Sequence, residues 1–454
     1  MKKNEWLENG SISFAGDLIT TGISLGEKEE VRDAAEFVLR AKGTHTGSLV
    51  KVAEHVLGIQ HDYLQDLPEI CLDSEIDVLG QRIHDIRRRL HDEPRNAFLW
   101  VNLARLYTTL GLPSQATNAI EIALCLAPLN RFVVRSAARL FIHQDEYRRA
   151  HDLLRNNDRV KHDPWLLGAE IAVAGTAGRT SRLIKTGRQM VEENKYEPWH
   201  LSELASALST LDFEAARSKD GRKHLAASLL APTENAVAQA AWIARQHFHV
   251  ILPLLGDNWP TSHEAQAWEY CRKAKWTASM DEAKLWLCDQ PFSSRPATLG
   301  SYIAAVDLGD FEESARIAKR GLVANPTDFT LLNNFVFARA QQNQISEARS
   351  EFNRVRPSTL SDEETFVWLA TSGLLAYREG NPDEGRALYL KAIEQGRKVT
   401  DEKRQISAFL WFALEESRIH SAEAPRYRQE ALEGAKHNRF PDVAPLIRRV
   451  AEYK

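Results

Sequence analysis

Five His-Asp dipeptides are the residues of this chain whose types and spacing could do chemistry. A histidine next to an aspartate can supply two ligands to a divalent metal, and a metal-bound water is a strong nucleophile for phosphoester hydrolysis. Such a site also needs a further histidine upstream and an aspartate downstream that converge on one pocket. Scattered copies favour surface composition instead, so a metal-dependent hydrolase of the His-Asp type is the enzyme alternative. The dipeptides begin at His61, His84, His91, His151 and His162.

Other catalytic motifs are incomplete. The pair His263-Glu264 is not followed by the second histidine that an HExxH zinc site requires. The segment 175–180 is glycine-rich, but it lacks the lysine of a phosphate-binding loop and is expected to follow a helix rather than a strand. We therefore expect a protein that is not an enzyme and that holds no metal or cofactor.

Composition and charge limit the classes of partner. The chain has 454 residues, 26% of them charged, and a net charge of -4. Proteins that bind a nucleic-acid backbone normally carry a basic excess, so nucleic acid is not expected as the main ligand. The run Arg87-Arg88-Arg89 is expected on the solvent face of its helix. No stretch approaches the ~18 apolar residues of a membrane span, and the N-terminus lacks the apolar core of a signal peptide.

Cysteine usage points to a reducing compartment. The four cysteines form no CxxC pair, which favours reduced thiols over a disulfide framework or a zinc site. The expected localisation is therefore cytoplasmic. The eleven tryptophans are expected in the core and between helices.

The elements that position these side chains are helices, because apolar residues recur at helical spacing. The clearest pattern has one helix with apolar residues at i, i+3, i+4 and i+7, followed by a second helix with a facing stripe. Small residues in both helices allow a close crossing, and a proline ends the second helix. The residues are Trp100, Leu103, Ala104, Tyr107, Gly111, Ala116, Ile120, Ala123 and Pro128.

This pattern closely resembles the 34-residue tetratricopeptide (TPR) repeat. Counting 34 residues from Trp100 reaches Val134, where a second unit follows in the same register. The segment 309–326 resembles the second half of the repeat, and further units follow it, one of them opened by a capping box of Ser361 and Glu364. The resemblance implies an all-α fold, a right-handed TPR-like α-solenoid of antiparallel helix pairs.

Four regions are expected along the chain. Residues 1–77 form an N-terminal helical cap, since terminal repeats are atypical. Residues 78–251 form a first array of TPR-like repeats, degenerate after 164. Residues 252–295 form an irregular helical or hinge segment, with a break at 252–261 where prolines and a glycine gather. Residues 296–454 form a C-terminal array that ends in capping helices.

The resemblance also implies a binding surface. In TPR proteins the first helices of successive pairs line a concave groove, and a fixed set of their positions faces the ligand. Arginine can bind a carboxylate through two hydrogen bonds and phenylalanine can anchor an apolar side chain, so an acidic or C-terminal peptide is the expected partner. In the alternative, the phenylalanines pack between repeats and the arginines pair with Glu121 or Asp145. The ligand-facing positions hold Phe98, Asn102, Arg105, Phe132, Arg135, Arg139 and His143.

The predicted function is therefore a non-catalytic scaffold or adaptor for protein–protein interaction, as a subunit of a larger complex. An alternative keeps the array but makes it a sensor or regulatory subunit that controls a separately encoded effector enzyme. The His-Asp hydrolase is the second alternative.

Overall fold

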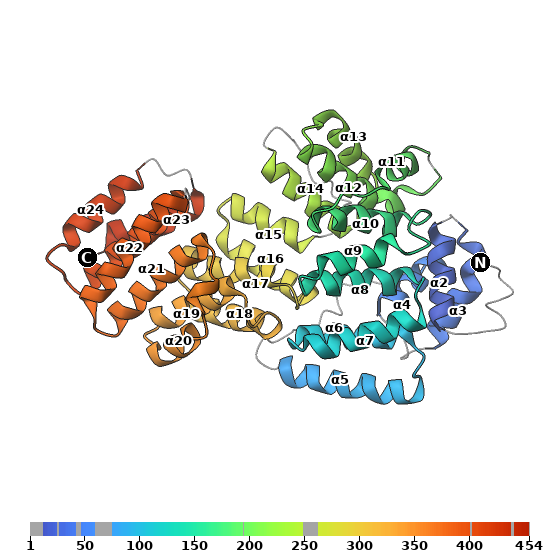
Figure 1. Cartoon of the computed structure of the whole chain (residues 1–454), viewed down its shortest axis with the longest axis horizontal. Helices are drawn as coiled ribbons and strands as arrows, with labels where there is room; N and C mark the ends of the chain where they lie inside the picture. The colour runs from blue at the N-terminus through green and yellow to red at the C-terminus, as the bar shows by residue number, and fades with distance from the viewer. Residues whose placement is uncertain are drawn as a thin grey trace. The chain divides into compact units, whose positions relative to one another are not determined.

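The computed structural model describes residues 12–24, 27–41, 47–59, 75–193, 195–247, 262–399, 402–436 and 440–453. Over these residues the chain is all-α and contains no strand (Figure 1). Consecutive helices form antiparallel pairs joined by short turns, and each pair packs on the next. The predicted fold class, a TPR-like α-solenoid, is confirmed.

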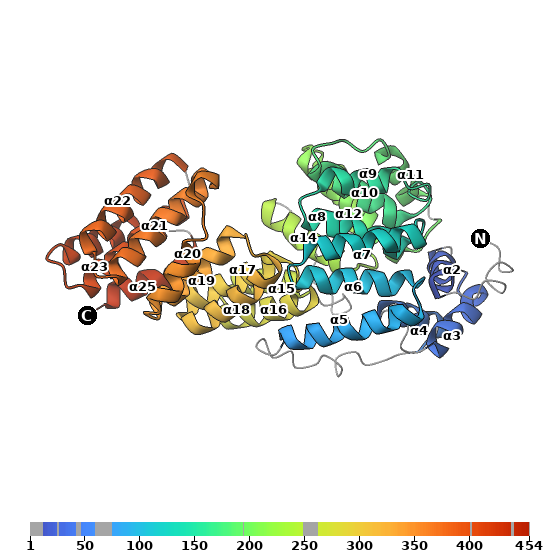
Figure 2. The same ribbon diagram turned by 60° about the horizontal axis from the view of Figure 1, so that its bottom comes forward.

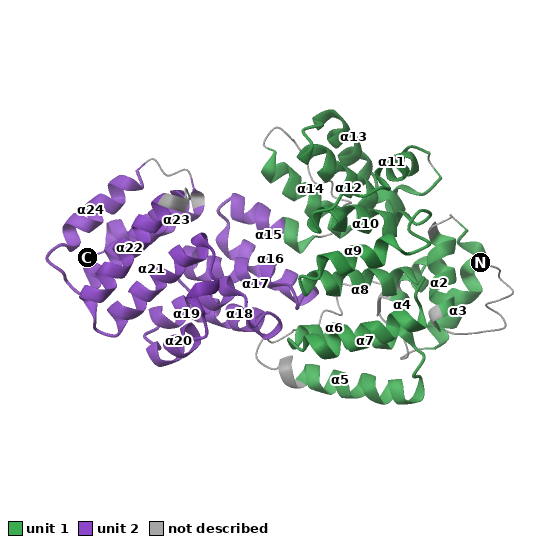
Figure 3. Cartoon of the chain, viewed as in Figure 1, with its two compact units in different colours: residues 1–265 green, residues 266–454 purple. Residues whose placement is uncertain are grey.

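The chain divides into two compact units, residues 1–265 and 266–454 (Figure 3). The division falls inside the predicted segment 252–295, but the predicted break at 252–261 lies outside the described residues. The other predicted boundaries stay predictions. In unit 1 the elements are α2 (Ile12–Ser24), the 3-10 turn η1 (Glu29–Val31), α3 (Arg32–Arg40), α4 (Gly47–Leu57), α5 (Glu75–Asp92), α6 (Ala97–Thr109), α7 (Pro113–Leu126), α8 (Arg131–His143), α9 (Tyr147–Arg155), α10 (Pro164–Thr176), α11 (Ile184–Glu192), α12 (Pro198–Glu214), α13 (Ser218–Ser228) and α14 (Glu234–Gln246).

The second unit begins within α15, the helix in which the division falls, and continues with helix pairs of the same kind. Its elements are α15 (His263–Arg272), α16 (Trp276–Asp289), α17 (Ser294–Tyr302), the π-helix η2 (Ile303–Leu308), α18 (Phe311–Ala324), α19 (Phe329–Gln341), α20 (Ile345–Phe352), η3 (Pro357–Thr359), α21 (Asp362–Arg378), α22 (Pro382–Val399), α23 (Glu402–Arg418), α24 (Ala424–Gly434), η4 (Pro441–Val443) and α25 (Ala444–Glu452).

Polar caps fix where the first helix of several pairs begins. The side chain of Asn96 accepts hydrogen bonds from the backbone N–H groups of Phe98 (3.1 Å) and Leu99 (3.3 Å), which the first turn of a helix otherwise leaves unpaired. Asn130 and Asp163 cap α8 and α10 in the same way. In unit 2, Ser361 and Glu364 form the capping box that the sequence predicts.

In nine helix pairs of the described residues, the turn between the two helices is closed by a residue with positive φ. In the α6–α7 turn this residue is Gly111, at φ 67°, and Leu112 N–H donates to the carbonyl oxygen of Tyr107 at 2.9 Å. This is a Schellman-type end, which pairs carbonyls that the last turn of a helix leaves open. The residues in this position are Gly111, Asp145, Gly178, Ala216, Ala274, Gly309, Asn343, Gly380 and His420. The first two are 34 residues apart, so the TPR period is visible in the backbone itself.

Packing within each unit follows the repeat. In unit 1, α6 packs on α7 and on α8, α8 packs on α10, and α10 packs on α12, which is how a solenoid propagates. Figure 2 shows α5, α6 and α7 side by side. The predicted small residues Ala104, Ala116 and Ala123 are buried where α6 and α7 cross. In unit 2, α17, α19, α21 and α23 stack in the same manner, and α25 packs against both η2 and α23. None of the described helices combines the length and apolar content that a bilayer crossing requires.

Candidate functional site

One row of aromatic side chains marks the starts of the first helices in unit 1. The second residue of each of the helices α6, α8, α10 and α12 is aromatic. These residues are Phe98, Phe132, Trp165 and Trp199. The ring centroids of Phe98 and Phe132 are 5.7 Å apart, and those of Trp165 and Trp199 are 4.9 Å apart. Aromatic pairs at these separations attract one another in addition to burying area. The row therefore consists of two packed aromatic pairs at the starts of successive first helices.

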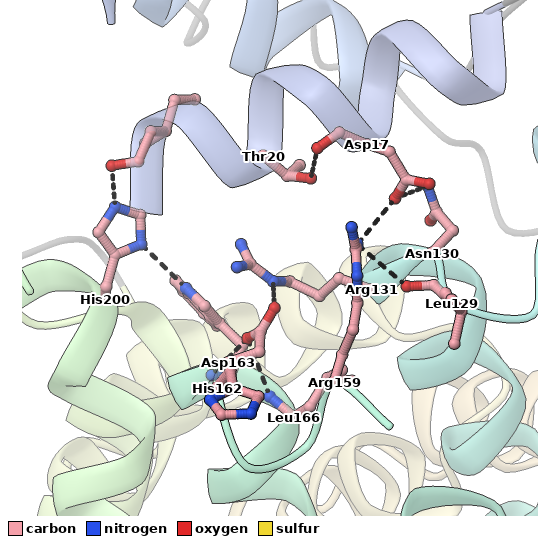
Figure 4. A network of polar contacts seen from close by, with 12 residues as sticks. Asp17, Thr20, Leu129, Asn130, Arg131, Arg159, His162, Asp163, Leu166 and His200 are labelled. Atoms are coloured by element: carbon pink, nitrogen blue, oxygen red, sulfur yellow. Dashed lines mark hydrogen bonds and ion pairs between the residues drawn. The ribbon is translucent and has the colours of Figure 1, made fainter. Parts of the chain in front are cut away.

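Helix α2 lies across this row. A Cβ at Gly16 would come within 2.9 Å of the Phe98 ring. Because glycine has no Cβ, α2 can approach α6 closely at this residue. The carboxylate of Asp17 accepts hydrogen bonds from Asn130 Nδ2 (2.9 Å) and from Arg159 (3.4 Å) (Figure 4). Burial raises the pKa of Asp17, and the nearby Arg159 opposes that rise. The N-terminal helix is thus held by both apolar and polar contacts.

His200 connects the other end of α2 to the array. Its Nδ1 accepts a hydrogen bond from Trp165 Nε1 at 3.0 Å, because an indole N–H can only donate. The proton of the neutral ring must then be on Nε2, which donates to the carbonyl oxygen of Ile23 at 2.9 Å (Figure 4). That carbonyl belongs to the last turn of α2, where no helical partner exists. Burial lowers the pKa of His200, in keeping with a ring whose two nitrogens are both engaged while neutral.

Three arginines run along α8 at four-residue spacing, so they share one helix face: Arg131, Arg135 and Arg139. Arg131 forms an ion pair with Asp163 at 2.6 Å, and burial lowers its pKa. Arg135 pairs with Glu203 of α12, and its guanidinium lies 4.9 Å from the centroid of the Trp165 ring. A side chain of α8 that reaches α12 must cross α10, which is possible only where the first helices converge. The arginine-bearing face of α8, called here the inner face of unit 1, is therefore turned toward α10 and α12.

Arg139 is the arginine of this row that is available at the surface. It is exposed, and it forms no ion pair within the described parts of the chain. The surrounding protein nevertheless desolvates its guanidinium, and with the neighbouring charge of Arg135 this lowers the pKa of Arg139, while the carboxylate of Glu203 partly opposes the shift. A cation in such a place gains more from an incoming carboxylate than one surrounded by water.

The predicted site residues are therefore found in different situations. Phe98 is only 2% exposed, because α2 and Phe132 cover it, so its side chain is not part of an open surface. The structure brings Phe132, Arg135 and Arg139 onto one helix. Asn102, Phe132, Arg135 and His143 are half-buried, and burial lowers the pKa of His143; Arg105 and Arg139 are exposed. A role of this set in partner binding stays a prediction.

Three residues of this face were not predicted from the sequence. Trp165 and Trp199 occupy the same repeat position as Phe98 and Phe132, and each follows a proline that opens its helix. That shared register was the signal that could have found them. Glu203 gave no such signal, because its role depends on Arg135, which lies 68 residues earlier.

The His-Asp dipeptides are separately engaged or exposed. His84 and His91 lie on the exposed face of α5. His151 is buried and its Nε2 contacts Glu170 at 3.0 Å, while Asp163 caps α10 and pairs with Arg131. His61 lies outside the described residues. In the part of the chain that the structure describes, no three His, Cys, Asp or Glu side chains are grouped so that they could hold a metal ion.

Comparisons with known proteins give a limited result. No protein-family model matches the chain, and no curated protein matches it. Among solved structures, yeast Tom70 aligns over 99% of this chain and 96% of its own, with 11% identity and a TM-score of 0.31. The human IFIT1 dimer with PPP-AAAA aligns over 93% of this chain and 94% of its own, with 13% identity and a TM-score of 0.34.

Proposed function

We propose that this protein is a divergent TPR-type scaffold, without catalytic activity, that binds an acidic segment of another protein along the inner face of unit 1. Arg139 and Arg105 would receive carboxylates of the partner. The half-buried Phe132 and the exposed Trp199 would receive its apolar side chains. The proposal extends to a role as a subunit of a larger cytoplasmic complex.

The observation that carries the proposal is the state of Arg139. Its neighbours on α8 are already paired, Arg131 with Asp163 and Arg135 with Glu203. Arg139 is exposed on the same face, desolvated by its surroundings and next to a second positive charge. An anion placed there would relieve an unfavourable environment, and a carboxylate can make two parallel hydrogen bonds to a guanidinium.

A protein segment suits this face better than a small molecule. Trp199 is 40% exposed beside the buried Trp165, so the aromatic row offers a partly open apolar step. Interfaces between proteins commonly combine aromatic and arginine side chains near their centre with polar groups around them. An extended or helical segment with alternating acidic and apolar residues would satisfy both kinds of group.

Charge reversal at Arg139 tests the proposal. The tagged chain and its Arg139→Glu variant are used to capture partners from the native host, and bound proteins are identified by mass spectrometry. Capture of a specific acidic partner should fall at least about tenfold in the variant, because an attraction becomes a repulsion at the same place. Arg135 is unsuitable for this test, since its reversal would set two carboxylates against each other.

Arg222→Glu provides the matched control, because Arg222 is an exposed arginine on α13. Circular dichroism should show the same helix content for all three proteins. Equal capture by the wild-type chain and the Arg139→Glu variant would overturn the proposed binding face. A partner that elutes with the chain at one stoichiometry from native extracts would support the role as a complex subunit.

A further inference from the structure

A second surface of unit 1 lies on the side where α5 and α7 flank α6. An open groove of about 400 Å³ runs there, and its lining is mainly apolar. This size is in the range of ~300–1,000 Å³ that binding pockets usually have. The groove is lined by Arg87, Leu90, His91, Trp100, Leu103, Tyr107, Gln115, Asn118, Ala119 and Ile122.

Two residues on the floor of this groove are partly exposed, although the residues at the equivalent positions of the next repeat are buried. Trp100 and Tyr107 are partly exposed, whereas the residues 34 positions later, Val134 and Phe141, are 0% and 2% exposed. The difference arises because α5 packs on α6 without an extensive contact with α7. Ile122 of α7 adds a 38% exposed apolar side chain at the rim. The groove is therefore an apolar face of the repeat that has no partner among the described elements.

The side chains that line the groove include basic residues and no acidic ones. The basic residues Arg87 and His91 stand on the α5 side. The ring of His91 also contacts Asp92 at 3.2 Å, but Arg87 forms no ion pair within the described residues and is exposed. A partner whose apolar side chains enter this groove would bring its flanking residues close to Arg87, so acidic flanks are favoured.

A neighbouring groove serves as an internal comparison. It lies between α7 and α9, has a volume of about 490 Å³, and is also mainly apolar. Its lining includes Asp152, Asp158 and Arg149. Asp152 is paired with Arg179 at 2.7 Å, and Arg149 is already paired with Glu121 and Glu146. A negatively charged segment would meet carboxylates there. The two grooves have similar size and floor, and they differ in charge.

We propose that the groove between α5 and α7 is a docking site for an acidic amphipathic segment of another protein, separate from the inner face of unit 1. Large apolar side chains of the segment pack on Trp100, Tyr107 and Ile122. Its carboxylates lie beside Arg87 and His91. Because this site is on α5 and α7 rather than along the arginines of α8, the chain can hold two partners at once.

The test uses a short fluorescein-labelled peptide with leucine and phenylalanine on one helical face and glutamate at the other positions. Fluorescence anisotropy should show saturable binding to the full chain. We expect Arg87→Glu to weaken the Kd roughly fivefold, and Ile122→Glu roughly tenfold because an apolar contact is also lost. The matched controls Arg222→Glu and Leu230→Glu should leave the Kd unchanged, since both replace exposed residues elsewhere in unit 1.

A crosslinking experiment locates the bound peptide independently. Benzoylphenylalanine is introduced at Asn118, which lines the groove of interest, or at Asn156, which lines the comparison groove; both residues are exposed. Only the Asn118 variant should crosslink to the acidic peptide. Equal binding of a peptide with lysine in place of glutamate would overturn the proposal, as would equal crosslinking at both positions. Self-association that Arg87→Glu abolishes would instead identify a second copy of this chain as the occupant, and would also overturn it.

Discussion

The guanidinium of Arg135 on α8 reaches the carboxylate of Glu203 on α12, across the helix that separates them in the stack. Asn235 on α14, the first helix of the next pair, also donates to Glu203 at 2.9 Å. Both ion-pair side chains are largely buried. The pair therefore ties together helices that are not neighbours in the chain.

Removal of either partner should loosen this part of the array. Glu203→Gln leaves the largely buried Arg135 without its carboxylate, and we expect a loss of about 1–3 kcal/mol in the free energy of unfolding. Urea denaturation followed by circular dichroism measures the change. In a double-mutant cycle, Arg135→Met with Glu203→Gln should cost less than the sum of the two single changes. Strict additivity would show that the pair contributes no coupling.

The attachment of α2 should weaken in mild acid. His200 has a lowered pKa, so the unfolded state binds a proton before the folded state does. The stability that its neutral ring contributes is complete above the unfolded pKa of about 6.5, and it is lost as pH falls from there through the folded pKa. Hydrogen exchange of the α2 amides, corrected for intrinsic rates, should show weaker protection at about pH 5 than at neutral pH. The difference should vanish in His200→Phe and persist in His84→Phe, whose ring is exposed.

Unit 2 contains a buried carboxylate, Asp307, that should make stability fall as the pH rises. Asp307 is 7% exposed, and neither of its oxygens accepts a hydrogen bond in the described structure. Burial raises its pKa to about 8, with a further rise from Asp442 that Lys403 and Arg449 oppose. Arg449 of α25 donates instead to the backbone oxygen of Val306 at 2.8 Å.

Because the folded pKa of Asp307 lies above the unfolded one, the folded state retains this proton when the unfolded state has lost it. Stability should therefore fall as pH rises from about 4 to about 8, and be constant with respect to this group above that range. Asp307→Asn should remove the slope and stabilise unit 2 by several kcal/mol at pH 8. Thermal unfolding over a pH series measures both effects. Asp383→Asn, at an exposed site, should keep the wild-type slope; the same slope in Asp307→Asn would assign the effect to another group.

The turn at Ala216 offers a stabilising change. This alanine has φ 56°, a conformation that costs a residue with a Cβ about 1–2 kcal/mol and costs glycine little. We expect Ala216→Gly to raise the free energy of unfolding by about 0.5–1 kcal/mol, after the greater entropy of unfolded glycine is subtracted. Ala215→Gly is the matched control, since Ala215 has φ -84° and gains nothing from glycine. A destabilised Ala216→Gly would mean that its turn is not strained.

The helix pairs could be predicted from the sequence, but the surfaces that other helices bury could not. The apolar stripe from Trp100 to Tyr107 predicts α6 correctly, and Gly111 marks its turn because glycine accepts positive φ. The equivalent turns at Asp145 and Ala216 also have positive φ but carry no glycine, so residue type does not mark them. Phe98 illustrates the limit for the site. Its burial depends on Gly16 of α2, and local spacing cannot show which surface a distant helix will cover.

The π-helix η2 has a consequence for how the array tolerates insertions. The turn residues Ala274 and Gly309 are 35 positions apart, one more than the 34 that separate Gly309 from Asn343. A π-turn holds an additional residue within a helix, and Asp310 N–H accordingly bonds back to the oxygen of Ala304 (2.8 Å), one residue further than in the other turns. The wider turn accommodates a single additional residue inside the helix, and the next turn, at Asn343, follows at the 34-residue spacing. The same bulge sets Asp307 in its buried position, which links a one-residue change in chain length to a new ionisable group in the core.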